Sequence, residues 1–231
     1  MNKYSLIIPC FNEEKNLPLL VDSCSKLLSN PEIEVVLVNN GSTDNSLKIM
    51  LNFSNKYHNL IVVNIKKNIG YGHGIIMGLQ KANGNVLSWT HADLQTNPND
   101  LIEGFKLFDS CDTKNAFVKG ERYGRKYSDV FFTIGMSFFE SILLKKKLWD
   151  INAQPTIFSK EFFLKWKNPP NDFSLDLYAY YFALNENFKI KRFKVFFGKR
   201  AHGVSNWNVD WKSKIKFIKR TFDFSFKLNK K

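Results

Sequence analysis

The chain has 231 residues, of which 44% are hydrophobic and 24% charged, and its formal net charge is +13. This length and this apolar share suit one folded domain with a sizeable core, and they exclude collagen-like and low-complexity chains. The excess of lysine and arginine predicts affinity for polyanions, which include nucleic acids, anionic membrane surfaces and phosphorylated substrates.

The cysteines and apolar runs predict a cytoplasmic protein. Cys10, Cys24 and Cys111 are odd in number and widely spaced, which fits neither a disulfide framework nor a zinc site. The N-terminus leads directly into a strand-like segment rather than a secretory leader. An uninterrupted apolar run of about 18 residues is missing, so no spanning helix is expected. The longest candidate, 130–144, is broken by Glu140 and followed by lysines.

Strand and helix patterns alternate in the first half of the chain. Continuous apolar runs predict buried strands at 5–9, 34–38, 60–63 and 86–90. Segments with apolar residues at helical spacing follow these strands. The alternation predicts a parallel sheet with right-handed crossovers, as in nucleotide-binding α/β proteins.

The alternation is less regular after residue 98. A lysine-rich segment at the end carries apolar residues at the spacing of an amphipathic helix. We expect a single domain made of 1–98, 99–208 and a basic C-terminal helix over 209–231. Within 99–208, helices are predicted at 101–108, 131–144 and 173–185, and strands at 116–120, 154–158 and 188–196.

Polar or glycine-rich segments follow three of the predicted strands. They are Asn39 and Asn40, the loop 70–74, and the segment 91–95 with His91, Asp93 and Gln95. Parallel strands bring such segments to one edge of the sheet, where α/β proteins bind ligands. Gly70 and Gly72 allow backbone N–H groups to approach an anion ahead of a helix. The alternative for these glycines is a flexible turn.

Asp93 is the best candidate for a metal ligand. Mg²⁺ or Mn²⁺ shared with a diphosphate needs only one or two protein carboxylates, because phosphate and water supply the other oxygens. The alternative is that Asp93 caps a helix or a local turn.

Basic residues later in the chain are candidates for holding a phosphate. The loop 199–207 contains Lys199, Arg200 and Ser205, and Arg122 follows an earlier predicted strand. Arginine can hold a phosphate bidentately, although a solvated basic turn is the alternative. Asp176 lies among apolar residues on a predicted helix. It is a candidate general base or acceptor-orienting group, with a buried structural salt bridge as the alternative.

Several segments resemble the motifs of family 2 glycosyltransferases with the GT-A fold, and they occur in the family's order. They are LIIPCFNE at 6–13, VNNGSTD at 38–44, NIGYGHG at 68–74, HADLQ at 91–95 and RAHGVS at 200–205. The resemblance is strongest to the polyprenyl-phosphate branch, which includes dolichol-phosphate mannose synthase-like enzymes. It implies a Rossmann-like, mostly parallel sheet flanked by helices, with a smaller C-terminal acceptor region.

The same resemblance implies a nucleotide-diphospho-sugar donor, Mg²⁺ or Mn²⁺, and inversion at the anomeric carbon. Gln95 would lie near the sugar, and Asp93 would hold the metal and the diphosphate, with His91 as a second candidate metal ligand. The donor would be bound by Pro9, Phe11, Glu13, Asn39, Asn40, Gly70, Gly72, His91 and Asp93. Donor diphosphate or acceptor phosphate would be bound by Arg122, Lys199, Arg200 and Ser205.

Two departures from the family pattern affect these expectations. Asn39 and Asn40 replace an acidic pair, which predicts altered nucleobase selectivity. His91 replaces the first Asp of the family's Asp-x-Asp motif. Histidine can bind Mn²⁺, whereas Mg²⁺ prefers oxygen, so metal binding rests on Asp93 with His91, or on Asp93 alone.

The acceptor expected from the resemblance is a polyprenyl phosphate, which is anionic and needs no general base. A sugar hydroxyl of a polysaccharide or lipooligosaccharide is the alternative acceptor, because the transmembrane pair of some relatives is missing; Asp176 would then be the base. The segments 131–147 and 209–231 are expected to rest on an anionic inner leaflet, with an ordinary core helix as the alternative for the first.

Two other classes of protein remain as alternatives. A non-catalytic nucleotide-sugar-binding protein would explain the altered acidic motifs. A nucleic-acid-binding protein would explain the charge, but the aromatic residues form no recognisable stacking motif, so no nucleic acid partner is expected. A homo-oligomer is left open.

Overall fold

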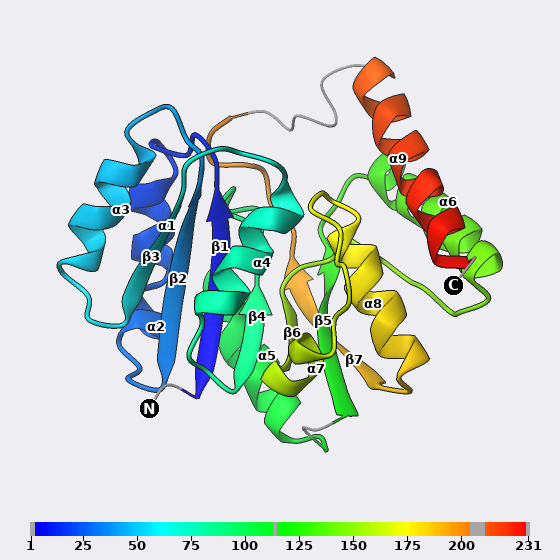
Figure 1. Ribbon diagram of the computed structural model, residues 1–231, viewed down its shortest axis with the longest axis horizontal. Helices are drawn as coiled ribbons and strands as arrows, with labels where there is room; N and C mark the ends of the chain where they lie inside the picture. The colour runs from blue at the N-terminus through cyan, green and yellow to red at the C-terminus, as the bar shows by residue number, and fades with distance from the viewer. Residues whose placement is uncertain (1–2, 113–114, 204–210, 230–231) are drawn as a thin grey trace.

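The computed structural model describes residues 3–112, 115–203 and 211–229, and it is built around one mixed sheet (Figure 1). The sheet has seven strands in the order β3-β2-β1-β4-β6-β5-β7. All strands run parallel except β6, which is antiparallel to both of its neighbours. The strands are β1 (Tyr4–Cys10), β2 (Ile33–Asn40), β3 (Leu60–Ile65), β4 (Val86–Trp89), β5 (Ala116–Tyr123), β6 (Thr156–Ser159) and β7 (Lys189–Phe196).

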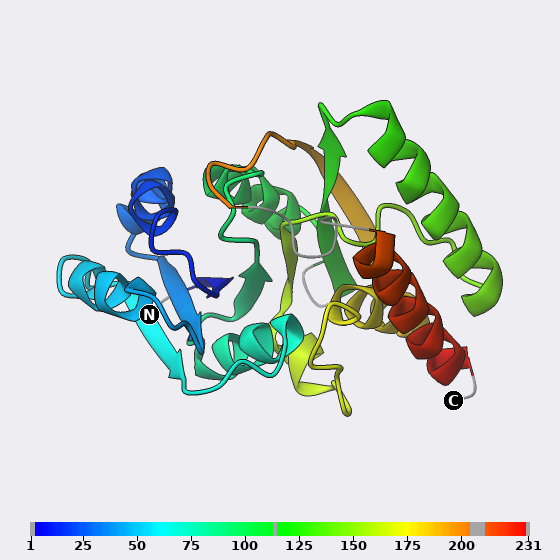
Figure 2. The ribbon, with the colours of Figure 1, turned by 90° about the horizontal axis from the view of Figure 1, so that it is seen from above.

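Helices cover both faces of the sheet, and Figure 2 shows these layers from above. The helices are α1 (Leu17–Ser23), α2 (Ser25–Leu28), α3 (Ser46–Ser54), α4 (Tyr71–Lys81), the 3-10 helix η1 (Pro98–Asp100), α5 (Leu101–Asp109), α6 (Tyr127–Leu144), α7 (Lys160–Leu164), α8 (Leu175–Asn185) and α9 (Trp211–Asn229).

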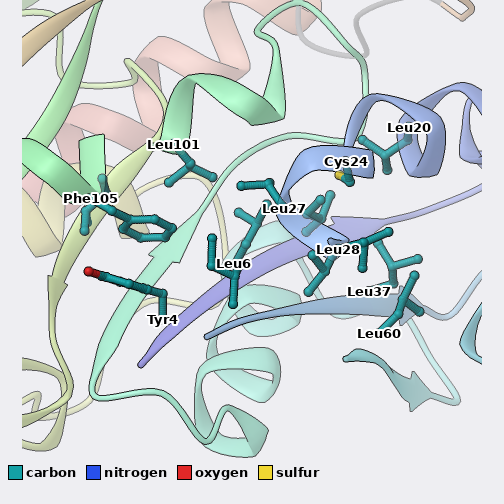
Figure 3. Close-up of a cluster of buried hydrophobic side chains, with 14 of the residues drawn as sticks. Tyr4, Leu6, Leu20, Cys24, Leu27, Leu28, Leu37, Leu60, Leu101 and Phe105 are labelled. Atoms are coloured by element: carbon teal, nitrogen blue, oxygen red, sulfur yellow. The ribbon is translucent and has the colours of Figure 1, made fainter. Parts of the chain in front are cut away.

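The central strands are apolar along their length because both of their faces are buried. Side chains alternate between the faces, so Leu6 and Ile8 of β1 pack into one cluster and Ile7 into the other. The first cluster lies under α1, α2 and α5, where Tyr4 stacks on Phe105 with ring centroids 4.3 Å apart (Figure 3). The second cluster lies under α4, α7 and α8.

The first half of the chain forms the predicted parallel strands, and the strand predicted at 154–158 is the antiparallel β6. The first helix, α1, begins at Leu17, several residues after the end of β1. Asn12 has a left-handed backbone with φ +57°, and its side-chain oxygen accepts a hydrogen bond from Thr43 N at 2.8 Å.

Helices α6 and α9 lie side by side at one end of the molecule (Figures 1 and 2). Phe139 and Phe222 join them with ring centroids 4.1 Å apart. Among the described residues, α6 is the helix that is long and apolar enough to cross a membrane by length and composition, with 17% of that span buried. The helix starts at Tyr127, before the predicted segment 130–144, and its apolar sequence is interrupted by Asp129 and Glu140. Its low burial also excludes an ordinary core helix.

Candidate functional site

The candidate site lies at the edge of the sheet where β1, β2, β4 and β7 end. The segment after β4 stays beside β1, because Thr90 N donates to the Ile7 carbonyl at 3.1 Å. Residues 91–95 then leave the sheet, and the loop after β7 approaches them. We call residues 198–203 of that loop the basic loop. The edge therefore gathers segments that are far apart in the sequence, as expected for parallel strands.

Asp93 and Arg200 form an ion pair at this edge. Arg200 Nη2 lies 2.9 Å from Asp93 Oδ2, and the two side chains are 28% and 8% exposed. The other carboxylate oxygen of Asp93 accepts from Gln95 N at 3.1 Å, which closes a local turn around Leu94. Asp93 therefore closes a local turn with one carboxylate oxygen and pairs with the guanidinium of Arg200 through the other.

Gln95 fixes the basic loop against the segment that contains Asp93. Gly198 N donates to the Gln95 carbonyl at 2.7 Å, and Gln95 Nε2 donates to the Gly198 carbonyl at 3.1 Å. Ala201 N donates to the Asp93 carbonyl at 3.4 Å. These bonds hold Arg200 in place from both sides along the chain.

Glu13 contributes a second carboxylate near Asp93. Burial raises the pKa of Glu13, a hydrogen bond from Asn16 opposes this rise, and the negative charge of Asp93 adds to it. Asn16 Nδ2 also donates to the His202 carbonyl at 3.4 Å. The turn after β1 and the basic loop are therefore connected, with two carboxylates and one guanidinium between them.

The two asparagines at the end of β2 have different surroundings. Asn39 is satisfied within the protein, since it donates to Asn64 Oδ1 at 2.8 Å and accepts from Ser42 N at 3.2 Å. Asn40 Nδ2 donates to the Gly70 carbonyl at 3.0 Å, while its buried Oδ1 has no hydrogen-bond partner among the described residues. Asn40 therefore keeps an unpaired, buried acceptor, whereas Asn39 holds the loop that follows β2.

Gly70 and Gly72 lie directly against the backbone of the segment 170–172. A Cβ at Gly70 would lie 2.1 Å from the Asn171 carbonyl, and one at Gly72 would lie 2.5 Å from the Pro170 carbonyl. Gly70 N donates to Asn68 Oδ1 and His73 N to the Asn171 carbonyl, both at 2.9 Å. The Gly70 amide is therefore used within the protein, and both glycines leave room for the backbone of 170–172.

His91 forms the end of an aromatic stack. Its ring lies 5.2 Å from Tyr71, whose other neighbour is Phe173 at 4.5 Å. Pro9 is half-buried, and Phe11 at the end of β1 is exposed. Sequence reasoning did not find Tyr71 or Phe173, although the Tyr between Gly70 and Gly72 is a bulky residue in an otherwise small loop.

Asp176 lies behind this stack and is 2% exposed. Its carboxylate accepts hydrogen bonds from Trp89 Nε1 at 3.3 Å and from Gln154 Nε2. Burial raises the pKa of Asp176, and the charges of Lys119 and His91 oppose that rise. The geometry makes Asp176 an internal anchor.

Lys119 is the cation of this buried region, and sequence reasoning missed it. Its ammonium donates to Thr156 Oγ1 at 2.9 Å. Burial lowers the pKa of Lys119 to about 7, while the charge of Asp176 acts in the opposite direction. The signal was a lysine inside the apolar strand run 116–120.

The remaining phosphate-binding candidates have separate surroundings where the structure describes them. Arg122 is held by the buried Asp150, with its Nε 3.0 Å from Asp150 Oδ1. Lys199 lines a groove of about 510 Å³ together with Gln95, Phe196 and Gly198. Ser205 lies outside the described residues.

The donor set at this edge suits a hard divalent cation shared with a diphosphate. No group of three His, Cys, Asp or Glu side chains that could hold a metal occurs in the described parts of the chain. A cation here would therefore rest on Asp93, with oxygens from a bound diphosphate completing its coordination. The nearby guanidinium of Arg200 would face the same diphosphate.

The sheet order and the site at its carboxyl edge are those of an α/β protein that places its ligand site beyond the ends of parallel strands. The chain belongs to glycosyl transferase family 2, whose sequence model matches residues 5–175. The family resemblance inferred from the motifs is thus confirmed.

Curated relatives fall in the polyprenyl-phosphate branch. An undecaprenyl-phosphate 4-deoxy-4-formamido-L-arabinose transferase of Proteus mirabilis is 36% identical over 106 residues, which cover 44% of this chain and 32% of the relative. A dolichyl-phosphate beta-glucosyltransferase of Trichomonas vaginalis is 33% identical over 127 residues, which cover 51% of this chain and 39% of the relative. The matches thus span 32% and 39% of the length of these relatives.

Solved glycosyltransferases share the fold. Glucosyl-3-phosphoglycerate synthase from Mycobacterium tuberculosis, in complex with UDP, superposes with a TM-score of 0.74 at 16% identity, covering 99% of this chain and 80% of that one. A mannosyltransferase from Pyrobaculum calidifontis, in complex with GDP-Man and Mn²⁺, gives 0.72 at 16% identity, covering 97% and 64%. The expected GT-A fold is confirmed.

Proposed function

We propose that this chain is an inverting glycosyltransferase that moves a sugar from a nucleotide-diphospho-sugar to a polyprenyl phosphate. The observation that carries the proposal is the Asp93–Arg200 pair at the carboxyl edge of the sheet. A carboxylate there suits a diphosphate-bound cation, and a guanidinium beside it suits phosphate oxygens. The acceptor class follows from the curated relatives, whose names state undecaprenyl phosphate and dolichyl phosphate.

The donor would lie across the ends of β1, β2 and β4. The unpaired, buried acceptor of Asn40 at the end of β2 would suit an N–H group of a nucleobase, and the exposed ring of Phe11 follows the neighbouring strand β1. Asp93 would hold Mg²⁺ or Mn²⁺, which would neutralise charge on the diphosphate. Mn²⁺ in the complex of the Pyrobaculum calidifontis enzyme supports a divalent cation here.

The reaction is a single displacement. An oxygen of the acceptor phosphate forms a bond to the anomeric carbon while the bond from that carbon to the diphosphate breaks. Arg200 would stabilise the negative charge that develops on the departing nucleoside diphosphate. The acceptor oxygen is already anionic, so no side chain has to remove a proton.

The environment of Asp176 favours a phosphate acceptor over a sugar hydroxyl. A general base must reach the proton that it removes, directly or through one water. Asp176 is buried and bound by Trp89 and Gln154, behind Tyr71 and His91. A sugar hydroxyl acceptor would require this carboxylate to reach the acceptor, whereas a phosphate acceptor leaves it as a structural anchor.

The acceptor also defines where the enzyme works. A polyprenyl phosphate is anchored in a membrane, and the proposed nucleotide-sugar donor is supplied from the cytoplasm. We therefore place the chain at the cytoplasmic face of a membrane, in peripheral contact with anionic lipid, in keeping with its charge of +13.

The test is a screen of nucleotide sugars by thermal shift, with Mg²⁺ or Mn²⁺, followed by turnover with a short polyprenyl phosphate. We expect at least one nucleotide sugar to raise the melting temperature and to be consumed, and Asp93→Asn to abolish both effects. Asp109→Asn is the matched control, because Asp109 also forms an ion pair, 2.7 Å from Lys3. Stabilisation without turnover would indicate a non-catalytic binding protein, and a complete absence of stabilisation would contradict the proposal.

A further inference from the structure

Helix α6 carries an apolar stripe that faces solvent. We define the α6 stripe as Tyr127, Phe131, Ile134, Phe138 and Ile142, which are all exposed large apolar or aromatic side chains. Their spacing of three and four residues places them on one side of the helix. Phe131 is 78% exposed and Phe138 67% exposed, values that no packed core residue has.

The opposite side of α6 is tied to the protein. Ser137 Oγ accepts from Asp150 N at 3.2 Å, and Ser141 Oγ accepts from Leu148 N at 2.9 Å. Glu140 is buried toward α9, beside Ser225. A helix held in this way cannot insert across a bilayer without breaking these contacts, so α6 is suited to lie along a surface.

Basic residues border the stripe. Lys126 precedes the helix, Lys145 and Lys147 follow it, and all three are exposed. The neighbouring α9 adds the exposed Lys219 and Lys227. The exposed acidic residues of the pair, Asp129 and Asp223, are outnumbered. On a membrane surface, the apolar stripe would contact the acyl chains, and the lysines at both ends of the helix would contact anionic headgroups.

The stripe begins at the same sheet edge as the candidate site. Tyr123 ends β5, Phe196 ends β7, and both rings are about half exposed and 5.6 Å apart. Tyr127, the first residue of α6, is four residues after Tyr123 in the sequence. Phe196 lines the groove that also contains Lys199 and Gln95. Exposed aromatic side chains therefore lead from α6 toward the basic loop.

We propose that the α6 stripe is a membrane-docking surface that lies flat on an anionic bilayer and turns the carboxyl edge of the sheet toward the lipid. The stripe extends over roughly 22 Å of helix at the usual rise per residue. The inference rests on the proposed function, because a lipid-linked phosphate must reach Arg200 while its chain stays in the membrane. Beyond that function, the inference identifies the face of the protein that contacts the bilayer.

The test is co-sedimentation of the full chain with phosphatidylcholine vesicles, with and without phosphatidylglycerol. We expect binding that requires the anionic lipid, and a loss of at least tenfold in the partition coefficient for the double variant Phe131→Ser and Phe138→Ser. The matched control is Leu164→Ser, since Leu164 is 72% exposed on α7, away from α6. Lys145→Glu with Lys147→Glu should weaken binding at low salt and leave the stripe intact.

Two outcomes would overturn the inference. One is equal vesicle binding by the wild type and the double variant. The other is a wild-type dimer that the double variant converts to a monomer without any vesicle binding, which would assign the stripe to a second copy. Circular dichroism and nucleotide-sugar thermal shifts on the same samples report folding and donor binding. Vesicle binding without donor binding would refute the proposed function and leave the docking surface standing.

Discussion

The guanidinium of Arg200 lies 2.9 Å from the carboxylate of Asp93, and this contact joins the end of β4 to the loop after β7. Asp93 is buried and Arg200 is partly exposed, so the pair presents its positive partner toward solvent. A diphosphate arriving at the edge would meet this guanidinium together with a carboxylate able to hold a cation.

Arg200→Ala is expected to lower the transfer rate by about 10²-fold, the usual effect of removing a group that stabilises developing negative charge. Arg200→Lys should recover only part of the rate, because lysine lacks the bidentate geometry. Initial rates under saturating donor measure this effect. The control is Lys194→Ala, which removes an exposed ion pair with Glu121. Equal rates for Arg200→Ala and the control would contradict the role of Arg200.

Substitutions of Asn39 and Asn40 at the end of β2 are expected to change different properties, namely stability and nucleotide affinity. Asn40→Ala removes a free buried acceptor, so we expect nucleotide affinity to fall by about tenfold, as for one hydrogen bond. Asn39→Ala breaks the bonds to Asn64 and Ser42, so it should lower the melting temperature. Calorimetric titration of nucleoside diphosphates and thermal unfolding separate the two. A reversal of these effects would show that Asn39 contacts the base.

Asp176→Asn is expected to keep transfer to a polyprenyl phosphate within about tenfold of the wild type, because that acceptor needs no base. The variant should be less stable, since the neutral side chain no longer offsets the charge of Lys119. Rates and melting temperatures are measured on one preparation. A loss of about 10³-fold in rate at an unchanged melting temperature would mark Asp176 as a general base.

Glu140 is expected to make stability depend on pH. Burial raises the pKa of Glu140 to about 7, so the folded state holds its proton more tightly than the unfolded chain does. Stability should therefore be highest below the unfolded pKa of 4.5 and fall as the pH rises to about 7. Glu140→Gln should raise the melting temperature at pH 8 and have little effect at pH 4.5. Equal effects at both pH values would contradict this assignment.

Local patterns predicted the first half of the fold well. The runs that became β1, β2 and β4 are apolar throughout, because a central parallel strand is buried on both faces. The same logic brought Asp93 and Asn40 to one edge. Contacts between distant segments could not be predicted in this way. The backbone at 170–172 fills the space beside Gly70 and Gly72, and the anchoring of Asp176 by Trp89 and Gln154 depends on three separate elements.

Helix α6 shows a second limit of pattern reading. Its apolar residues lie both on the side that packs and on the side that faces solvent, so composition alone does not say which side is buried. The contacts of Ser137, Ser141 and Glu140 are among those that identify the packed side. The exposed stripe is what remains after those contacts are made.

The most direct test of the account is transfer of labelled sugar from the nucleotide sugar that stabilises the chain to a polyprenyl phosphate, by the wild type and by Asp93→Asn. We predict a lipid-linked sugar phosphate of inverted anomeric configuration, formed only with a divalent cation and lost in the variant. Transfer to a sugar hydroxyl but not to the lipid phosphate, or equal transfer by Asp93→Asn, would contradict it.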